Sequence, residues 1–120
     1  MPSPREGCLF CRLVAEGDHV HRADGFVAIR DINPISETHL LVLPERHVDT
    51  FKDVAAFPDQ EAARMLRFVA ETAEIAGLEG YRVLVNVGAT GGQTIFHLHW
   101  HVLGGRPDTE RIARALEATA

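Results

Sequence analysis

Three histidines at alternate positions constrain the fold of this chain more than any other feature. His97, His99 and His101 lie in an otherwise apolar run over residues 95–103. Successive side chains of a β-strand point to opposite faces, so this spacing predicts that the three imidazoles share one face. The other face then receives the intervening apolar residues, Leu98, Trp100 and Val102. The prediction is a strand with one apolar face and one face of titratable groups.

A row of imidazoles favours a functional interpretation. Imidazole titrates near pH 6.5 and can act as nucleophile, base or acid, and three neighbouring rings cannot all be protonated without strong repulsion. An affinity tag would consist of consecutive histidines at a terminus. A metal site using all three is awkward, because same-face neighbours on a strand lie about 7 Å apart. One or two of them could still bind a metal.

Length and charge narrow the possible classes of protein. The 120 residues are enough for one domain with its own core, so we expect a single domain over residues 1–120. The net charge of −5, without a basic stripe, argues against DNA or RNA as a partner, although a single nucleotide remains possible. No secretion signal and no membrane-spanning apolar run are evident, so we expect a cytoplasmic protein with no membrane partner.

Strand signals outnumber helix signals. His19–Arg22 and Phe26–Asp31 flank an Asp-Gly turn and predict a hairpin. His39–Leu43 predicts a third strand that ends at a proline, and Tyr81–Val87 predicts a fourth before the histidine strand.

Helical periodicity is clearest over Pro58–Leu78, and a second helix is expected over Asp108–Ala118. Pro4–Ala15 predicts a short helix or loop. The fold class is therefore α+β, with an antiparallel sheet of about five strands and one long helix packed on it.

Cys8 and Cys11 form a C-x-x-C pair with three possible meanings. A redox pair requires a thioredoxin-like βαβ context, which the sequence lacks. A zinc site requires two further ligands, for which His47 and one histidine of the triad are available. Two ordinary thiols are an equally good interpretation of the residues alone.

Polar and glycine-rich positions near strand ends are candidates for nucleotide binding. The loop Gly91–Thr94 can turn backbone N–H groups toward a phosphate, or it can be only a hairpin loop. Asp31 can accept hydrogen bonds from sugar hydroxyls, or it can cap a turn. Asn86 has the same two interpretations.

Taken together, Asn86–Gly88, Gly91–Thr94 and His97–Arg106 resemble the signature of the histidine triad (HIT) superfamily. The branch of purine nucleoside phosphoramidases is the most similar, and the resemblance extends to Phe26–Pro34 and Thr38–Pro44. It therefore covers nearly the whole chain. The resemblance implies a HIT-like fold and a homodimer whose two copies share a sheet.

The resemblance also implies roles for the histidines. His99 would attack the α-phosphorus and form a nucleotidyl-histidine intermediate. His97 would lie near the leaving group, His101 would orient the nucleophile, and His39 would extend that hydrogen-bond network. The nucleotide would contact His99 and His101 together with Asp31, Ile32, Asn86, Gly92, Gln93 and Thr94.

A zinc site follows from the same resemblance, through bacterial members and related hexose-phosphate uridylyltransferases. Its ligands would be Cys8, Cys11, His47 and His97, and the zinc would be structural. A zinc-bound His97 could not also protonate the leaving group, so water or the substrate would have to do so. No redox cofactor is implied.

The predicted function is cleavage of the P–N bond in purine nucleoside 5′-phosphoramidates, which releases a nucleoside monophosphate. Aminoacyl-adenylates are further candidate substrates. One alternative is a dinucleoside polyphosphate hydrolase or phosphorylase that uses the same nucleophile. Another is a nucleotide-binding module without turnover. Animal relatives end in an aromatic tail that this sequence lacks, which leaves the identity of the leaving group open.

Overall fold

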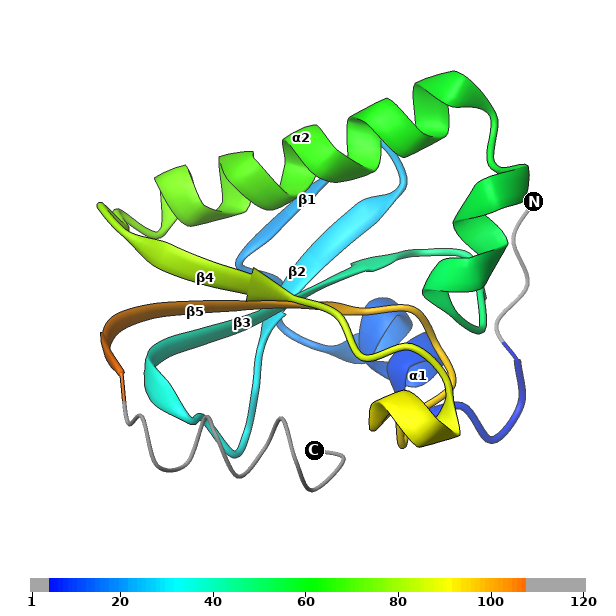
Figure 1. Ribbon diagram of the computed structural model, residues 1–120, viewed down its shortest axis with the longest axis horizontal. Helices are drawn as coiled ribbons and strands as arrows, with labels where there is room; N and C mark the ends of the chain where they lie inside the picture. The colour runs from blue at the N-terminus through cyan, green and yellow to red at the C-terminus, as the bar shows by residue number, and fades with distance from the viewer. Residues whose placement is uncertain (1–4, 108–120) are drawn as a thin grey trace.

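A computed structural model describes residues 5–107 of the chain. The expected helix at Asp108–Ala118 lies outside the described residues. Five antiparallel strands form one sheet in the order β1-β2-β3-β5-β4, which confirms the α+β class and the number of strands (Figure 1). The strands are β1 (His21–Ala23), β2 (Phe26–Arg30), β3 (Ser36–Pro44), β4 (Tyr81–Leu84) and β5 (Trp100–Pro107).

The long helix α2 (Asp59–Ile75) lies across one face of the sheet (Figure 1). Met65, Phe68 and Val69 pack there against Leu98 and Val102. The helix begins after Pro58, and Asp59 and Glu61 in its first turn complement the helix dipole. It ends three residues earlier than predicted, because Gly77 follows the cap residue in a left-handed conformation.

The short helix α1 (Leu9–Glu16) lies on the opposite face (Figure 1). Cys8 caps it, with its Sγ accepting the backbone N–H of Cys11. A second apolar cluster, separate from the one under α2, fills the space between α1 and the sheet. It contains Phe10, Val14, Val27, Ile29, Leu41 and Leu43. The central strands β2 and β3 therefore bury both of their faces.

The histidine segment differs from the sequence prediction, because only His101 lies in a strand. The ladder between β3 and β5 begins at the pair Val42 and Trp100. Pro44 has no backbone N–H, and its carbonyl accepts a hydrogen bond from the ring of His97. Leu98 donates its backbone N–H to Val48 beyond β3. His97 and His99 therefore precede the strand in irregular backbone.

Smaller differences concern where strands end. The fourth strand stops at Leu84 and not at Val87, and the third begins at Ser36 and not at His39. Two 3₁₀ segments complete the described chain, η1 (Phe51–Ala56) and η2 (Ala89–Gly91). In the part of the chain that the structure describes, no helix is long and apolar enough to span a bilayer.

Candidate functional site

Five histidines from three segments of the chain gather on the α1 side of the sheet. Ring centroids lie 5.1 Å apart for His47 and His97, 5.1 Å for His99 and His101, and 5.2 Å for His39 and His101. We call His47 and His97 the metal end of this row, and His39, His99 and His101 the catalytic end. The alternation of the triad places all three of its rings opposite the helix α2.

The metal end meets the two cysteines. The ligand atoms of Cys8, Cys11, His47 and His97 all lie within 4.8 Å of one another. Cys11 Sγ is 3.2 Å from His47 Nδ1 and 3.5 Å from His97 Nδ1, while Cys8 Sγ is 3.6 Å from the latter. Two thiols and two imidazoles at this spacing are a donor set typical of tetrahedral zinc.

Hydrogen bonds prepare both of these imidazoles to bind a metal. The Nε2–H of His97 donates to the carbonyl of Pro44 at 2.8 Å, and that of His47 donates to the carboxylate of Asp49 at 2.6 Å. Neither acceptor can donate, so each neutral ring carries its proton on Nε2 and directs the Nδ1 lone pair toward the sulfurs. Burial lowers the pKa of His97 to about 4 and so keeps it in this neutral form.

The two sulfurs also accept backbone hydrogen bonds, from Cys11 N–H to Cys8 and from Arg5 N–H to Cys11, each at 3.3 Å. Such bonds favour the thiolate form. Burial raises the pKa of the Cys11 thiol, so a thiolate there needs a cation beside it. The donor set therefore fits zinc.

At the catalytic end, the protein fixes the opposite nitrogen of the ring. His99 donates Nδ1–H to the backbone carbonyl of His97 at 2.7 Å, which leaves the lone pair on Nε2. Phe10 contacts the ring edge-on, with centroids 4.8 Å apart. Burial lowers the pKa of His99, so the ring is unprotonated at neutral pH. The result is a positioned imidazole suited to nucleophilic attack.

A chain of hydrogen bonds sets the tautomer of His101. The backbone N–H of Ile35 donates to His39 Nδ1 at 3.2 Å, so the proton of His39 is on Nε2. That proton is donated to His101 Nδ1 at 2.9 Å, which places the proton of His101 on its own Nε2. Among residues 5–107 this Nε2 is buried without a hydrogen-bond partner. An unpaired buried donor is costly, so it indicates where a ligand oxygen would bind.

His97 turns its ring toward the metal end. Its ring is fully buried, and its two nitrogens face Pro44 and the cysteines. Asp31 instead lies near the catalytic end, with Oδ2 3.4 Å from His39 Nε2, while its Oδ1 accepts the N–H of Asn33. Ile32 beside it is 89% exposed.

The glycine loop is largely occupied with its own contacts. The side chain of Gln93 accepts from Gly88 N–H and donates to the carbonyls of Asp49 and Ile95, so it braces the loop. The N–H of Gly92 donates to Ala89 and is not free for a phosphate. Thr94 is exposed, and Asn86 is half-buried.

Sequence reasoning missed Phe10, Ile35, Pro44 and Asp49. Only Asp49 has a sequence signal, which is a carboxylate two residues after a candidate metal ligand. Ile35 and Pro44 act through their backbone groups, which no residue pattern reveals.

Comparison with known proteins gives consistent results. A model of the HIT domain matches residues 12–108. The purine nucleoside phosphoramidase of Escherichia coli K12 is 37% identical over 107 residues, which cover 85% of this chain and 90% of that protein. A histidine triad protein from Clostridium difficile superposes with a TM-score of 0.76 at 32% identity and covers 87% of this chain and 95% of its own. A zinc-bound histidine triad family protein from Mycobacterium smegmatis superposes with a TM-score of 0.68 at 28% identity. The match covers 94% of this chain and 92% of that protein.

Proposed function

This chain belongs to the HIT family, and we propose that it is a hydrolase that cleaves the P–N bond of purine nucleoside 5′-phosphoramidates. One observation carries the proposal. The lone pair of His99 Nε2 and the unpartnered Nε2–H of His101 belong to neighbouring rings, 5.1 Å apart between centroids. A nucleophile and a hydrogen-bond donor therefore lie side by side.

In the proposed mechanism, His99 Nε2 attacks the α-phosphorus, and the P–N bond breaks as the nucleotidyl-histidine bond forms. The departing amine takes its proton from water or already carries it in the substrate, because the Nε2–H of His97 is held by Pro44. Water then attacks the phosphorus, the bond between phosphorus and His99 Nε2 breaks, and the nucleoside monophosphate leaves as the water's proton passes to solvent. The Nε2–H of His101 donates to a phosphoryl oxygen whose charge grows in both steps.

Residues at the rim of the site would hold the nucleoside. The carboxylate of Asp31 suits the vicinal hydroxyls of ribose, and the exposed side chain of Ile32 offers the base an apolar surface. Asn86 and Thr94 would contact the phosphate. Gln93 and Gly92 would shape the loop, since their polar groups are engaged within the protein.

Two further features belong to the proposal. Zinc bound by Cys8, Cys11, His47 and His97 would tie α1 to the segment before β5 and would take no part in the chemical steps. A homodimer would extend the sheet at β4, an edge strand that exposes Tyr81 and Val83 at 41% and 42%.

The proposal is tested by AMP release from an adenosine 5′-phosphoramidate, with diadenosine polyphosphate as a competing substrate. Wild type, His99→Ala and the control His19→Ala, outside the site, are compared. We expect turnover of the phosphoramidate that His99→Ala abolishes and His19→Ala retains. Preference for the polyphosphate would favour the alternative hydrolase, and tight AMP binding without turnover of either substrate would indicate a binding module.

A further inference from the structure

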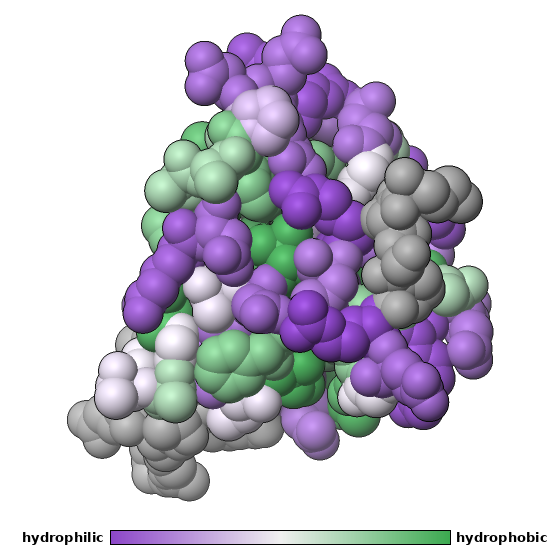
Figure 2. Space-filling model, turned by 90° about the vertical axis from the view of Figure 1, so that its right-hand side faces the viewer, coloured by the Kyte–Doolittle hydropathy of each residue, from purple (hydrophilic) through white to green (hydrophobic). Residues whose placement is uncertain are grey.

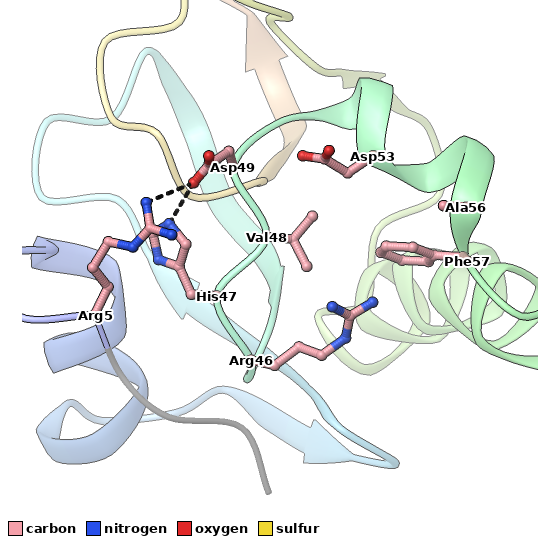
Figure 3. A pocket seen from close by; sticks show the side chains of 8 residues that line it. All are labelled: Arg5, Arg46, His47, Val48, Asp49, Asp53, Ala56 and Phe57. Carbon is pink, nitrogen blue, oxygen red and sulfur yellow. Dashed lines mark hydrogen bonds and ion pairs between the residues drawn. The ribbon is translucent and has the colours of Figure 1, made fainter.

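Asp49 contacts the candidate metal site without being one of its ligands. Its Oδ1 accepts hydrogen bonds from His47 Nε2 at 2.6 Å and from Arg5 Nη1 at 3.2 Å (Figure 3). The side chain of His47 is 8% exposed and that of Asp49 is 47% exposed. The carboxylate therefore connects a buried ring to the surface.

This contact determines which nitrogen of His47 can bind a metal. A neutral imidazole has one N–H, and the carboxylate holds it on Nε2, which leaves the lone pair on Nδ1. Nδ1 is the atom that lies 3.2 Å from Cys11 Sγ. With the proton on Nδ1 instead, His47 would point a hydrogen atom at the sulfur and the donor set would lose one ligand. Partners of this kind commonly set how tightly a protein binds its metal.

We propose that Asp49 is a positioning residue that holds His47 in its metal-binding tautomer and thereby sets the affinity of the chain for zinc. This inference rests on the proposed zinc site. His97 has an equivalent partner in the carbonyl of Pro44, which belongs to the backbone. Asp49 is therefore the partner that a side-chain substitution can remove.

Arg5 supports the same arrangement from two sides. Its guanidinium binds Asp49, and its backbone N–H donates to Cys11 Sγ. Figure 2 views the molecule from the side that carries this N-terminal segment and η1, and hydrophilic residues predominate on that face. Asp49 lines a cavity of about 350 Å³ there. Substitution of its side chain therefore disturbs no apolar core.

The same cavity supplies a matched control, Asp53 (Figure 3). Its carboxylate accepts the backbone N–H of Thr50 at 3.1 Å, which is a local cap of η1. Removal of Asp53 takes the same charge from the same cavity and leaves the contact with His47 in place.

The test measures zinc affinity by competition with a chromophoric chelator for wild type, Asp49→Ala, Asp49→Asn and Asp53→Ala. Asp49→Ala should bind zinc roughly 10- to 100-fold more weakly than wild type. Asp49→Asn should lose less, because its amide oxygen still accepts the Nε2–H. Asp53→Ala should match wild type. In zinc-free wild type, ring ¹⁵N NMR should show the proton of His47 on Nε2, a result that does not depend on how any variant folds.

Equal zinc affinity in Asp49→Ala and wild type would overturn the inference, as would an equal loss in Asp53→Ala, which would assign the effect to charge alone. A proton on Nδ1 of His47 would overturn it as well. Failure of wild type to bind zinc would be a different result, because it would remove zinc from the proposed function.

Discussion

The two ends of the histidine row use one type of side chain in opposite ways. At the metal end, oxygen acceptors hold Nε2–H and free Nδ1, whereas at the catalytic end Nδ1 is the engaged atom, by the backbone in His39 and His99 and by the ring of His39 in His101. Both ends are buried, and burial lowers the pKa of His97, His99 and His101 alike. The chemistry of each ring therefore depends on its hydrogen-bond partner more than on its position in the sequence.

His97 belongs to both ends through different atoms. Its ring faces the cysteines, while its backbone carbonyl accepts the Nδ1–H of His99. Because the second contact uses the backbone, His99, the proposed nucleophile, keeps its tautomer whatever happens to the ring of His97. The comparison thus predicts that metal binding and turnover can be separated by mutation.

The largest expected effect is at the proposed nucleophile, His99. His99→Ala removes the attacking nitrogen and should lower kcat by about 10⁴-fold or more, as loss of a covalent nucleophile does in other hydrolases. Its zinc content should equal that of wild type, measured by atomic emission on the same preparation. Loss of zinc together with turnover would contradict the separation of the two ends.

Removal of the cysteines tests the other end. The double variant Cys8→Ser, Cys11→Ser should lose about one zinc per chain and unfold at a lower temperature than wild type, because bound zinc stabilises the folded state. Its kcat should fall much less than that of His99→Ala, since the bond from His99 to the backbone of His97 remains. Loss of turnover as complete as in His99→Ala would show that the ends act as one site.

A smaller effect is expected at His39, whose proposed role is only to orient the ring of His101. His39→Leu removes the donor to His101 Nδ1, so His101 no longer carries its proton on Nε2 alone. The fall in kcat should be smaller than the roughly 10²- to 10⁴-fold loss typical when an acid–base group itself is removed. His39→Gln, whose amide can still donate, should restore part of the rate. Equal rates for the two variants would argue against orientation by this bond.

The sequence predicted those features that depend on side-chain periodicity. The alternation at His97, His99 and His101 correctly placed Leu98 and Val102 on the face opposite the imidazoles, and in the structure both join the apolar cluster under α2. The strand there was predicted too long, because its continuation depends on Pro44, which lacks an N–H and whose carbonyl accepts from a side chain. Such competition between ring and backbone leaves no periodic signal.

The sequence indicated which residues form the candidate site, but it did not indicate which ring nitrogens carry protons. Spacing and resemblance indicated Cys8, Cys11, His47 and His97, and the structure brings all four together. They did not indicate which nitrogen of each ring is free. That depends on Asp49, on the N–H of Ile35 and on two backbone carbonyls, which come from distant parts of the chain.

The smallest expected effect concerns stability in acid and compares both ends at once. Burial, with nearby His99 and His39, lowers the pKa of His101 to about 3, against 6.5 for an ordinary histidine. Below pH 6.5 the unfolded chain therefore binds a proton that the folded chain excludes, so the free energy of unfolding falls as the pH falls. The loss is at most about 1.4 kcal/mol per pH unit for each such group.

Denaturant unfolding of zinc-free protein between pH 7 and 5 should show this dependence of the free energy of unfolding on pH. His101→Gln should show a shallower slope, because the contribution of His101 is removed while the burial of His97 still contributes. Parallel slopes would mean that the catalytic end adds nothing to the acid sensitivity of the fold.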